Sequence, residues 1–172
     1  MDFLNLAKER YSCRKFTNQP VEQEKIDKII KAAISAPSAT NAQPVHFWLI
    51  NSADGLKKIN EVTPYGFGAS NIIVVGGKPA EAWIRKSDGK NFSEVDAAIA
   101  ASHIILAVHA LGLRTTWVGV IDIPKIKELF PEMAEYEIVG LFPIGYADDS
   151  AAGQPSKRHF MRKTRDEIVT IL

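Results

Sequence analysis

The sequence predicts a single α+β domain, and three observations support this prediction. The chain has 172 residues, of which 46% are apolar and 24% are charged, so it is long enough to bury one hydrophobic core. Residues 22–35 space their apolar side chains as a core-facing helix does, and residues 97–111 form a long apolar run that ends at Gly112. Apolar runs with the length of buried strands lie between and after these helices, at residues 45–51, 71–76 and 137–146. We therefore expect one domain over residues 1–172.

The N-terminal part is expected to form two helices joined by a basic segment. Residues 3–9 form a short amphipathic pattern, with Asp2 as a plausible N-cap. The basic segment, residues 10–16, follows this helix directly. The helix over residues 22–35 must end near Pro37, because proline disfavours helical backbone in the residue before it.

A loop of small and amide residues, 35–44, is expected next. It leads into the strand at 45–51, a short helix near 54–62 and the strand at 71–76. The polar stretch 78–91 has no periodicity that predicts an element.

The central helix gives the strongest pattern in the second half. Residues 93–96, Ser-Glu-Val-Asp, resemble a capping box ahead of the apolar run 97–111, and Gly112 predicts its end. The run contains His103 and His109 and is shorter than a membrane span, which favours a helix buried in a soluble core.

The remaining elements are short, apart from one strand. A strand is expected at 115–119, a helix beginning at Pro124, and a long strand at 137–146 that Pro143 interrupts. Residues 164–167 resemble a second capping box.

The formal net charge of +1 gives no overall preference for nucleic acid or for an anionic membrane. The cations cluster locally, at residues 10–15 and 157–165, so an anion site must come from one of these clusters. A nucleic-acid interpretation of the clusters is weakened by the near-neutral balance and by the lack of a recognised binding motif. We therefore expect neither a nucleic-acid nor a membrane partner.

The N-terminus has no basic region followed by an apolar run, so no secretory signal is expected. One cysteine, Cys13, excludes an internal disulfide and fits a reducing compartment. The expected location is the cytoplasm.

The basic segment is the first candidate for a binding site. Arg10, Ser12 and Arg14 alternate, so in an extended segment their side chains project to one side and those between them to the other. The planar fork of arginine fits two phosphate oxygens, and a serine hydroxyl adds a neutral donor. The segment indicates an anion site, and the alternative interpretation is a solvated basic turn.

Four blocks of the sequence resemble the FMN-dependent nitroreductase family in both identity and order. They are residues 10–16, residues 37–44, the alanine-rich helix that leads into residues 112–119, and residues 163–165. The resemblance implies a three-layer α/β/α sandwich with a mixed, mainly antiparallel sheet flanked by helices. It also implies an intertwined homodimer with FMN at the subunit interface.

The resemblance assigns parts of FMN to parts of this chain. The basic segment and the C-terminal Lys-x-Arg would hold the phosphate and ribityl chain, and the loop at 37–44 would reach the flavin across the dimer interface. Arg14 would stabilise the negative charge that reduction places on the pyrimidine side of the ring. The expected FMN-binding residues are Arg10, Tyr11, Ser12, Arg14, Pro37, Ser38, Ala39, Asn41, Gln43, Trp117, Val118, Gly119, Lys163 and Arg165.

The implied activity is an NAD(P)H-dependent oxidoreductase. Hydride would pass from NADH or NADPH to flavin N5 and on to a small electron-poor acceptor, such as a nitroaromatic or a quinone. No catalytic side chain is expected, because the cofactor carries the chemistry. A flavin-binding or flavin-storage protein without useful turnover stays open.

Two departures from the family limit what the resemblance implies. Residues 61–68 offer no lysine to the flavin, and the stretch between Pro79 and Ser93 is too short for the helices that roof the site in larger members. The substrate class therefore does not follow from the resemblance.

The other chemically capable residues favour structural roles. His103 and His109 are six residues apart, a spacing that does not place two ligands on one helical face, so no metal site is expected. Cys13 alternates away from the arginines and has no placed base, which makes a nucleophile improbable. Phe47 and Trp48 are expected in the core. The weaker candidates for lining a substrate pocket are Tyr65, Trp83 and Phe92.

Overall fold

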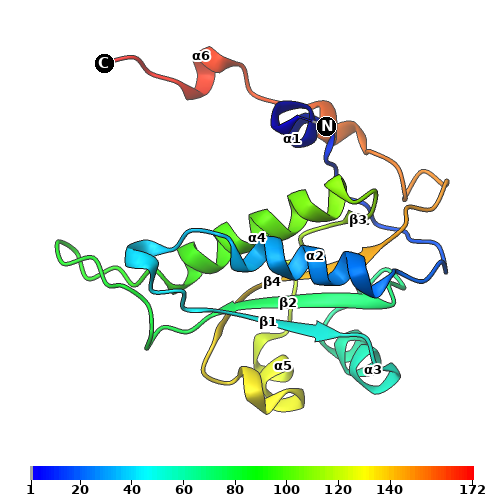
Figure 1. The fold of residues 1–172 in the computed structure, drawn as a ribbon, viewed down its shortest axis with the longest axis horizontal. Helices are drawn as coiled ribbons and strands as arrows, with labels where there is room; N and C mark the ends of the chain where they lie inside the picture. The colour runs from blue at the N-terminus through cyan, green and yellow to red at the C-terminus, as the bar shows by residue number, and fades with distance from the viewer. Residues whose placement is uncertain (1) are drawn as a thin grey trace.

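The computed structural model describes residues 2–172 and is built on a four-stranded antiparallel sheet (Figure 1). The strand order is β1-β2-β4-β3. The strands are β1 (Val45–Ile50), β2 (Asn71–Gly77), β3 (Arg114–Thr115) and β4 (Glu137–Gly145). The parallel component of the predicted mixed sheet is a single bridge between Ser12 and Thr115.

Helices cover both faces of this sheet (Figure 1). Helices α2 (Gln23–Ile34) and α4 (Ser93–Ala110) pack on one face, and α3 (Ala53–Val62) and α5 (Ile123–Leu129) on the other. Alternate residues of β2 enter the two cores, because successive side chains of a strand point to opposite faces. Ile73 and Val75 join the core below α2 and α4, whereas Ile72 and Val74 join the other. The predicted three-layer α/β/α arrangement is therefore confirmed.

The short 3₁₀ helices lie in the connections between these elements. They span Ala39–Asn41, Pro131–Met133 and Lys157–Phe160.

The prediction for the start of α4 is wrong, because its polar side chains bond to other parts of the chain. The N-cap is Phe92, and no side chain of residues 93–96 caps the helix. The Ser93 hydroxyl donates to the Glu137 carboxylate, and Asp96 accepts the backbone N–H of Ala39 at 2.9 Å. The end of α4 is as expected, since Gly112 has a φ of +78° and closes the helix.

The prediction of a strand at 115–119 is also wrong, because β3 ends at Thr115. The indole of Trp117 lies against Gly140, and its N–H donates to the Val139 carbonyl at 2.8 Å. Only Val118 pairs again with the sheet, through an isolated bridge to Leu141. The segment after β3 thus stays beside β4 without regular strand pairing, and residues 116–120 line a cavity there.

Both ends of the chain lie above the sheet, where α1 is beside residues 159–162 and the C-terminus extends away from it (Figure 1). Helix α1 (Phe3–Glu9) is capped by Asp2 as predicted, but none of its side chains is buried. Phe3 and Leu4 are 65% and 78% exposed. The C-terminal segment carries α6 (Arg165–Ile168), whose predicted capping box between Thr164 and Glu167 is present. Within residues 2–172, no helix combines the length and apolar character needed to cross a membrane.

A Gly77→Ala variant is expected to destabilise the fold. A Cβ at Gly77 would lie 2.3 Å from the Ser93 carbonyl oxygen, so α4 could not keep its approach to β2. Overpacking of this kind costs about 1–3 kcal/mol, and two backbones give less room to adjust than side chains do. Urea unfolding followed by circular dichroism measures the loss. Gly119→Ala is the matched control, because a Cβ there meets no atom within 4 Å. Equal stability of the two variants would contradict the close packing described here.

Candidate functional site

The basic segment is extended and attached to the edge of the sheet, as its alternation predicted. The Cys13 N–H donates to the Thr115 carbonyl at 3.0 Å, and the Arg14 N–H donates to the Ala152 carbonyl at 3.0 Å. Tyr11 and Cys13 point inward and are buried. Arg10, Ser12 and Arg14 point the other way, so the buried residues of the segment fix the position of its donors.

These three donors line one side of a cavity of about 200 Å³, which we call the cation pocket. The other side comes from the C-terminal segment, about 150 residues further along the chain. The full lining consists of Arg10, Ser12, Arg14, Ser156, Arg158, His159 and Arg162. Among residues 2–172, none of its four guanidinium groups forms an ion pair with a carboxylate.

The cation pocket is electrostatically unfavourable without an anion. Burial lowers the pKa of Arg10, and the nearby charge of Arg162 lowers it further. Both causes disfavour the positive form of the side chain that the pocket holds. A phosphate bound among the four arginines would reverse the repulsion and accept several charge-assisted hydrogen bonds. The lining therefore fits a phosphate group.

The residues at the far end of the basic C-terminal cluster do not line this cavity. Lys163 and Arg165, which the sequence favoured, are exposed at the start of α6, and this segment leads away from the body (Figure 1). Arg158 and Arg162 line the cavity instead. Composition placed both in the basic cluster without singling them out, since Arg158 lies in the 3₁₀ helix Lys157–Phe160 and Arg162 lies beyond its end. Tyr11 lies behind the pocket, with its hydroxyl donating to the Gly153 carbonyl at 3.1 Å.

A second cavity, of about 180 Å³, shares one lining residue with the first, and we call it the ring pocket. Arg14 lines both cavities. The ring pocket is lined by Arg14, Tyr65, Phe67, Thr116, Trp117, Val118, Gly119 and Val120. The backbone N–H of Val118 donates to the Leu141 carbonyl, and the Val118 carbonyl accepts the Leu141 N–H. The space beside Gly119 is open. The predicted Trp-Val-Gly segment therefore lines the same pocket as Arg14 of the basic segment.

Phe67 is a lining residue that sequence reasoning missed. Its φ is +53°, which is uncommon for a residue with a bulky side chain. Its ring lies 5.8 Å from that of Tyr65, which was a candidate. The flanking Gly66 and Gly68 were the available signal for an unusual backbone here. The other two aromatic candidates, Trp83 and Phe92, pack on each other at 4.9 Å and do not line these two pockets.

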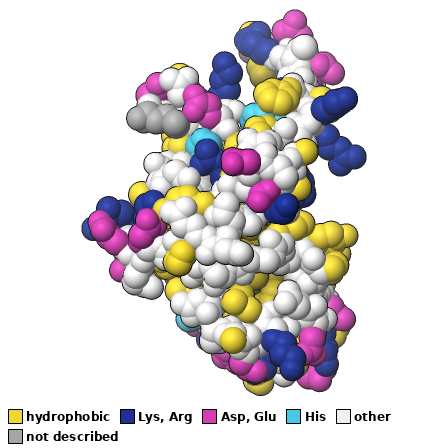
Figure 2. Space-filling model, turned by 90° about the vertical axis from the view of Figure 1, so that its right-hand side faces the viewer, with side chains coloured by type: hydrophobic (Ala, Val, Ile, Leu, Met, Phe, Trp, Pro, Cys, Tyr) yellow, Lys and Arg dark blue, Asp and Glu magenta, His cyan; other side chains and the backbone are white. Residues whose placement is uncertain are grey.

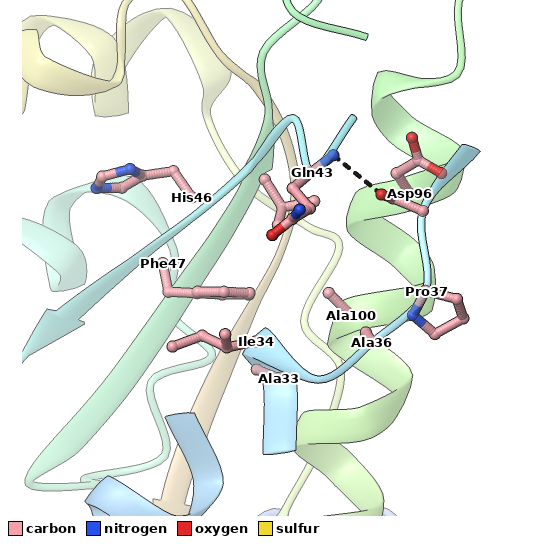
Figure 3. A pocket seen from close by; sticks show the side chains of 11 residues that line it. Ala33, Ile34, Ala36, Pro37, Gln43, His46, Phe47, Asp96 and Ala100 are labelled. Atoms are coloured by element: carbon pink, nitrogen blue, oxygen red, sulfur yellow. Dashed lines mark hydrogen bonds between the residues drawn. The ribbon is translucent and has the colours of Figure 1, made fainter. Parts of the chain in front are cut away.

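The predicted loop at 37–44 lines neither the cation pocket nor the ring pocket. Pro37, Ser38 and Gln43 line a third cavity, of about 240 Å³, beside Ile34, Phe47 and Asp96 (Figure 3). This loop follows the C-terminal end of α2, whereas the basic segment precedes the opposite end of that helix (Figure 1). The third cavity shares no lining residue with the cation pocket or the ring pocket. Within one chain, the predicted FMN-binding residues thus form two separate groups: one lines the cation pocket and the ring pocket, and the other lies in the loop at 37–44.

The surface around the cation pocket is charged and partly apolar. Figure 2 shows Lys and Arg side chains, with Asp and Glu side chains between them, over the narrower upper part of the molecule, where α1 and the C-terminal segment lie in Figure 1. Apolar side chains stand among them. The exposed apolar residues of this region include Phe3, Leu4, Phe160, Met161, Ile168, Ile171 and Leu172.

Cys13, which is buried, and His103, which is partly buried, take structural positions. Burial raises the pKa of the Cys13 thiol, which opposes the thiolate form that a nucleophile needs. Nδ1 of His103 lies 3.1 Å from the Ala32 carbonyl oxygen, which links α4 to α2. Within residues 2–172, no group of three or more His, Cys, Asp or Glu side chains is placed to hold a metal ion.

His109 is expected to make the stability of the protein depend on pH. Burial lowers its pKa, and the charge of Arg114 lowers it further. The unfolded chain therefore takes up a proton near pH 6.5 that the folded chain does not. Folding stability should be complete above that pH and should fall as the pH drops from about 6.5 through the lower pKa of the folded state. Urea unfolding between pH 8 and pH 5 measures this loss.

A His109→Gln variant should lose this part of the pH dependence. His46→Gln is the control, since His46 is exposed. An unchanged pH profile in His109→Gln would contradict the assignment.

Comparison with known proteins agrees with this arrangement. Residues 7–64 and 65–146 match the family model of the Nitroreductase family. A protein of Methanothermobacter thermautotrophicus, with the provisional name NADH dehydrogenase/NAD(P)H nitroreductase, is 35% identical over 150 residues, which cover 85% of this chain and 78% of that protein.

Solved structures share the fold over almost the whole chain. That of a nitroreductase family protein from Clostridium difficile 630 has a TM-score of 0.90 at 31% identity and covers 99% of this chain and 98% of its own. That of a provisionally described nitroreductase from Desulfovibrio desulfuricans, in complex with FMN, has a TM-score of 0.78 at 25% identity and covers 98% and 95%. The chain therefore belongs to the nitroreductase family.

Proposed function

We propose that this protein is an FMN-dependent oxidoreductase that uses NADH or NADPH to reduce small electron-poor acceptors such as nitroaromatics or quinones. The observation that carries the proposal is the pair of pockets that share Arg14. Four arginines without carboxylate partners among the described residues surround the first, and Arg14 leads into the second beside the open space at Gly119. A phosphate joined to a flat ring system by a short polar chain matches this order of environments.

The residues of the two pockets would bind different parts of FMN. Arg10, Arg158 and Arg162 would hold the phosphate, with Ser12 as a neutral donor. Arg14 would place a fixed positive charge near the ring, where it favours the reduced, more negative flavin. When bound, FMN supplies the redox chemistry by taking hydride from the nicotinamide and passing reducing equivalents to the acceptor.

The proposal includes a homodimer in which each flavin site uses both subunits. Asn41 and Gln43 are exposed amides at the end of α2 that is remote from the cation pocket. Their donors and acceptors suit a polyhydroxylated chain or a ring edge, and a second subunit could bring them there. A partner would also cover the apolar side chains of α1 and of the C-terminal segment. Lys163 and Arg165 stay predicted FMN ligands within this dimer, as does Tyr11.

The relatives support the redox part of the proposal. The similar protein of Methanothermobacter thermautotrophicus carries the name of an NAD(P)H nitroreductase, and the similar structure from Desulfovibrio desulfuricans holds FMN. The acceptor, the preference between NADH and NADPH, and the cytoplasmic location remain predictions.

Turnover distinguishes this function from flavin binding alone. The protein loaded with FMN should oxidise NADH or NADPH when menadione or 4-nitrobenzoate is present, faster than the same concentration of free FMN. Arg14→Gln removes the positive charge beside the ring pocket, which also belongs to the cation pocket, so it should slow turnover when the variants are compared at saturating FMN. A protein that binds FMN but gives no more turnover than free FMN would instead support the flavin-storage alternative.

A further inference from the structure

The loop Ser38–Gln43 has a backbone that needs outside support. Thr40, Asn41 and Gln43 have φ values of +53°, +58° and +51°. These are left-handed conformations that residues with side chains adopt at a cost, and they persist where neighbouring groups hold them. The two amides proposed to contact FMN stand on two of these three positions. The position of the amides therefore depends on what holds the loop.

The loop is held by hydrogen bonds within it and by one that leaves it. The Gln43 N–H donates to the Ser38 hydroxyl at 2.9 Å, the bond drawn in Figure 3, and the Asn41 N–H donates to the Ser38 carbonyl at 3.0 Å. The Ala39 N–H donates to Oδ1 of Asp96 at 2.9 Å. Among the hydrogen bonds of the described residues, this is the one that connects Ser38–Gln43 to another part of the protein.

Among the described residues, the Asp96 side chain forms no hydrogen bond within its own helix, α4. It lies in the first turn and a half of α4, past the N-cap Phe92, and it is only 1% exposed. Burial of a carboxylate is unfavourable unless hydrogen bonds compensate it, although the N-terminal end of a helix lowers the penalty. Its Oδ2 atom has no partner among the described residues. The Ala39 N–H is thus the main hydrogen-bond partner of this buried group.

We infer that Asp96 is a positioning residue for the flavin site: its carboxylate fixes the Ala39 backbone and so places the Asn41 and Gln43 amides toward the flavin bound by the partner subunit. This inference rests on the proposed function and on the shared site. It assigns a role to a residue of the central helix that touches neither the cation pocket nor the ring pocket.

The test compares Asp96→Leu with Asp96→Asn. Leucine has a similar size and no acceptor, whereas asparagine keeps a carbonyl oxygen that can accept the Ala39 N–H. Asp96→Leu should weaken FMN binding about 5- to 150-fold, the range for leaving a polar partner unsatisfied, and Asp96→Asn should restore most of the affinity. Fluorescence quenching during FMN titration gives the affinities, and thermal unfolding of the apoproteins shows that both variants fold. Should Asp96→Leu fail to fold, Asp96→Ala replaces it.

Subunit exchange separates positioning from a general loss of structure. An Asp96→Leu subunit mixed with an Arg10→Ala subunit should form heterodimers with one tight FMN site, because the two defects then fall in the same site. Mixed with Asn41→Ala, it should give no tight site. Wild-type affinity in Asp96→Leu, or no recovery with Arg10→Ala, would overturn the inference while FMN binding by the unaltered protein still stood. Failure of the unaltered protein to bind FMN would instead overturn the proposed function.

Discussion

An Arg10→Ala variant is expected to bind FMN about 10- to 150-fold more weakly than the unaltered protein. The variant loses charge-assisted hydrogen bonding to the phosphate, which contributes roughly 1.5–3 kcal/mol. The apoprotein should keep its stability or gain some, because burial and the charge of Arg162 both disfavour the Arg10 cation in the fold. The FMN affinity should thus fall without a loss of apoprotein stability.

The measurement combines FMN titration with thermal unfolding of the apoprotein. Lys15→Ala is the matched control, since Lys15 belongs to the same segment but pairs with Asp148 at 3.4 Å and does not line the cation pocket. Arg10→Lys should give an intermediate affinity, because it keeps the charge and loses the planar fork. Equal FMN affinity in Arg10→Ala and Lys15→Ala would place the phosphate elsewhere.

A mixture of Arg10→Ala and Asn41→Ala subunits is expected to regain tight FMN binding. Asn41→Ala alone should weaken binding by roughly 1–3 kcal/mol if it leaves a polar partner unsatisfied. If each site takes Arg10 from one subunit and Asn41 from the other, a heterodimer has one doubly altered site and one intact site. Tight binding then returns to half of the sites of each heterodimer.

Titration of the mixture before and after subunit exchange measures this recovery. The separate homodimers provide the baseline, since every site in them carries one alteration. If both residues came from the same subunit, every site of the mixture would stay singly altered. The absence of recovery, or a stable monomer with full FMN content, would contradict the shared site.

Much of the fold follows from local patterns. The apolar spacing of α2, the long apolar run of α4 and the stop at Gly112 depend on neighbouring residues, so the sequence predicted them. The start of α4 depended on distant partners instead: Asp96 accepts from Ala39, 57 residues away, and Ser93 donates to Glu137. No local pattern contains that information, which is why the capping box was wrong.

In the candidate site, too, local patterns predicted some features, whereas others depend on the three-dimensional arrangement. Alternation predicted that Arg10, Ser12 and Arg14 share one side, because an extended segment has a fixed period. Composition located the C-terminal cations but not the members that face the pocket, since that depends on where the chain turns after Lys157–Phe160. The separation of the loop Ser38–Gln43 from the cation pocket follows from the course of α2 and needs the three-dimensional arrangement.

Anaerobic titration with FMN followed by NADH tests the central proposal most directly. The apoprotein should take up one FMN per subunit, with a shifted flavin absorption spectrum. Addition of NADH or NADPH without oxygen should then bleach the bound flavin, and an acceptor such as menadione should restore its colour. An apoprotein that ignores added FMN, or bound FMN that neither nicotinamide bleaches, would contradict the proposal that this protein is a flavin-dependent oxidoreductase.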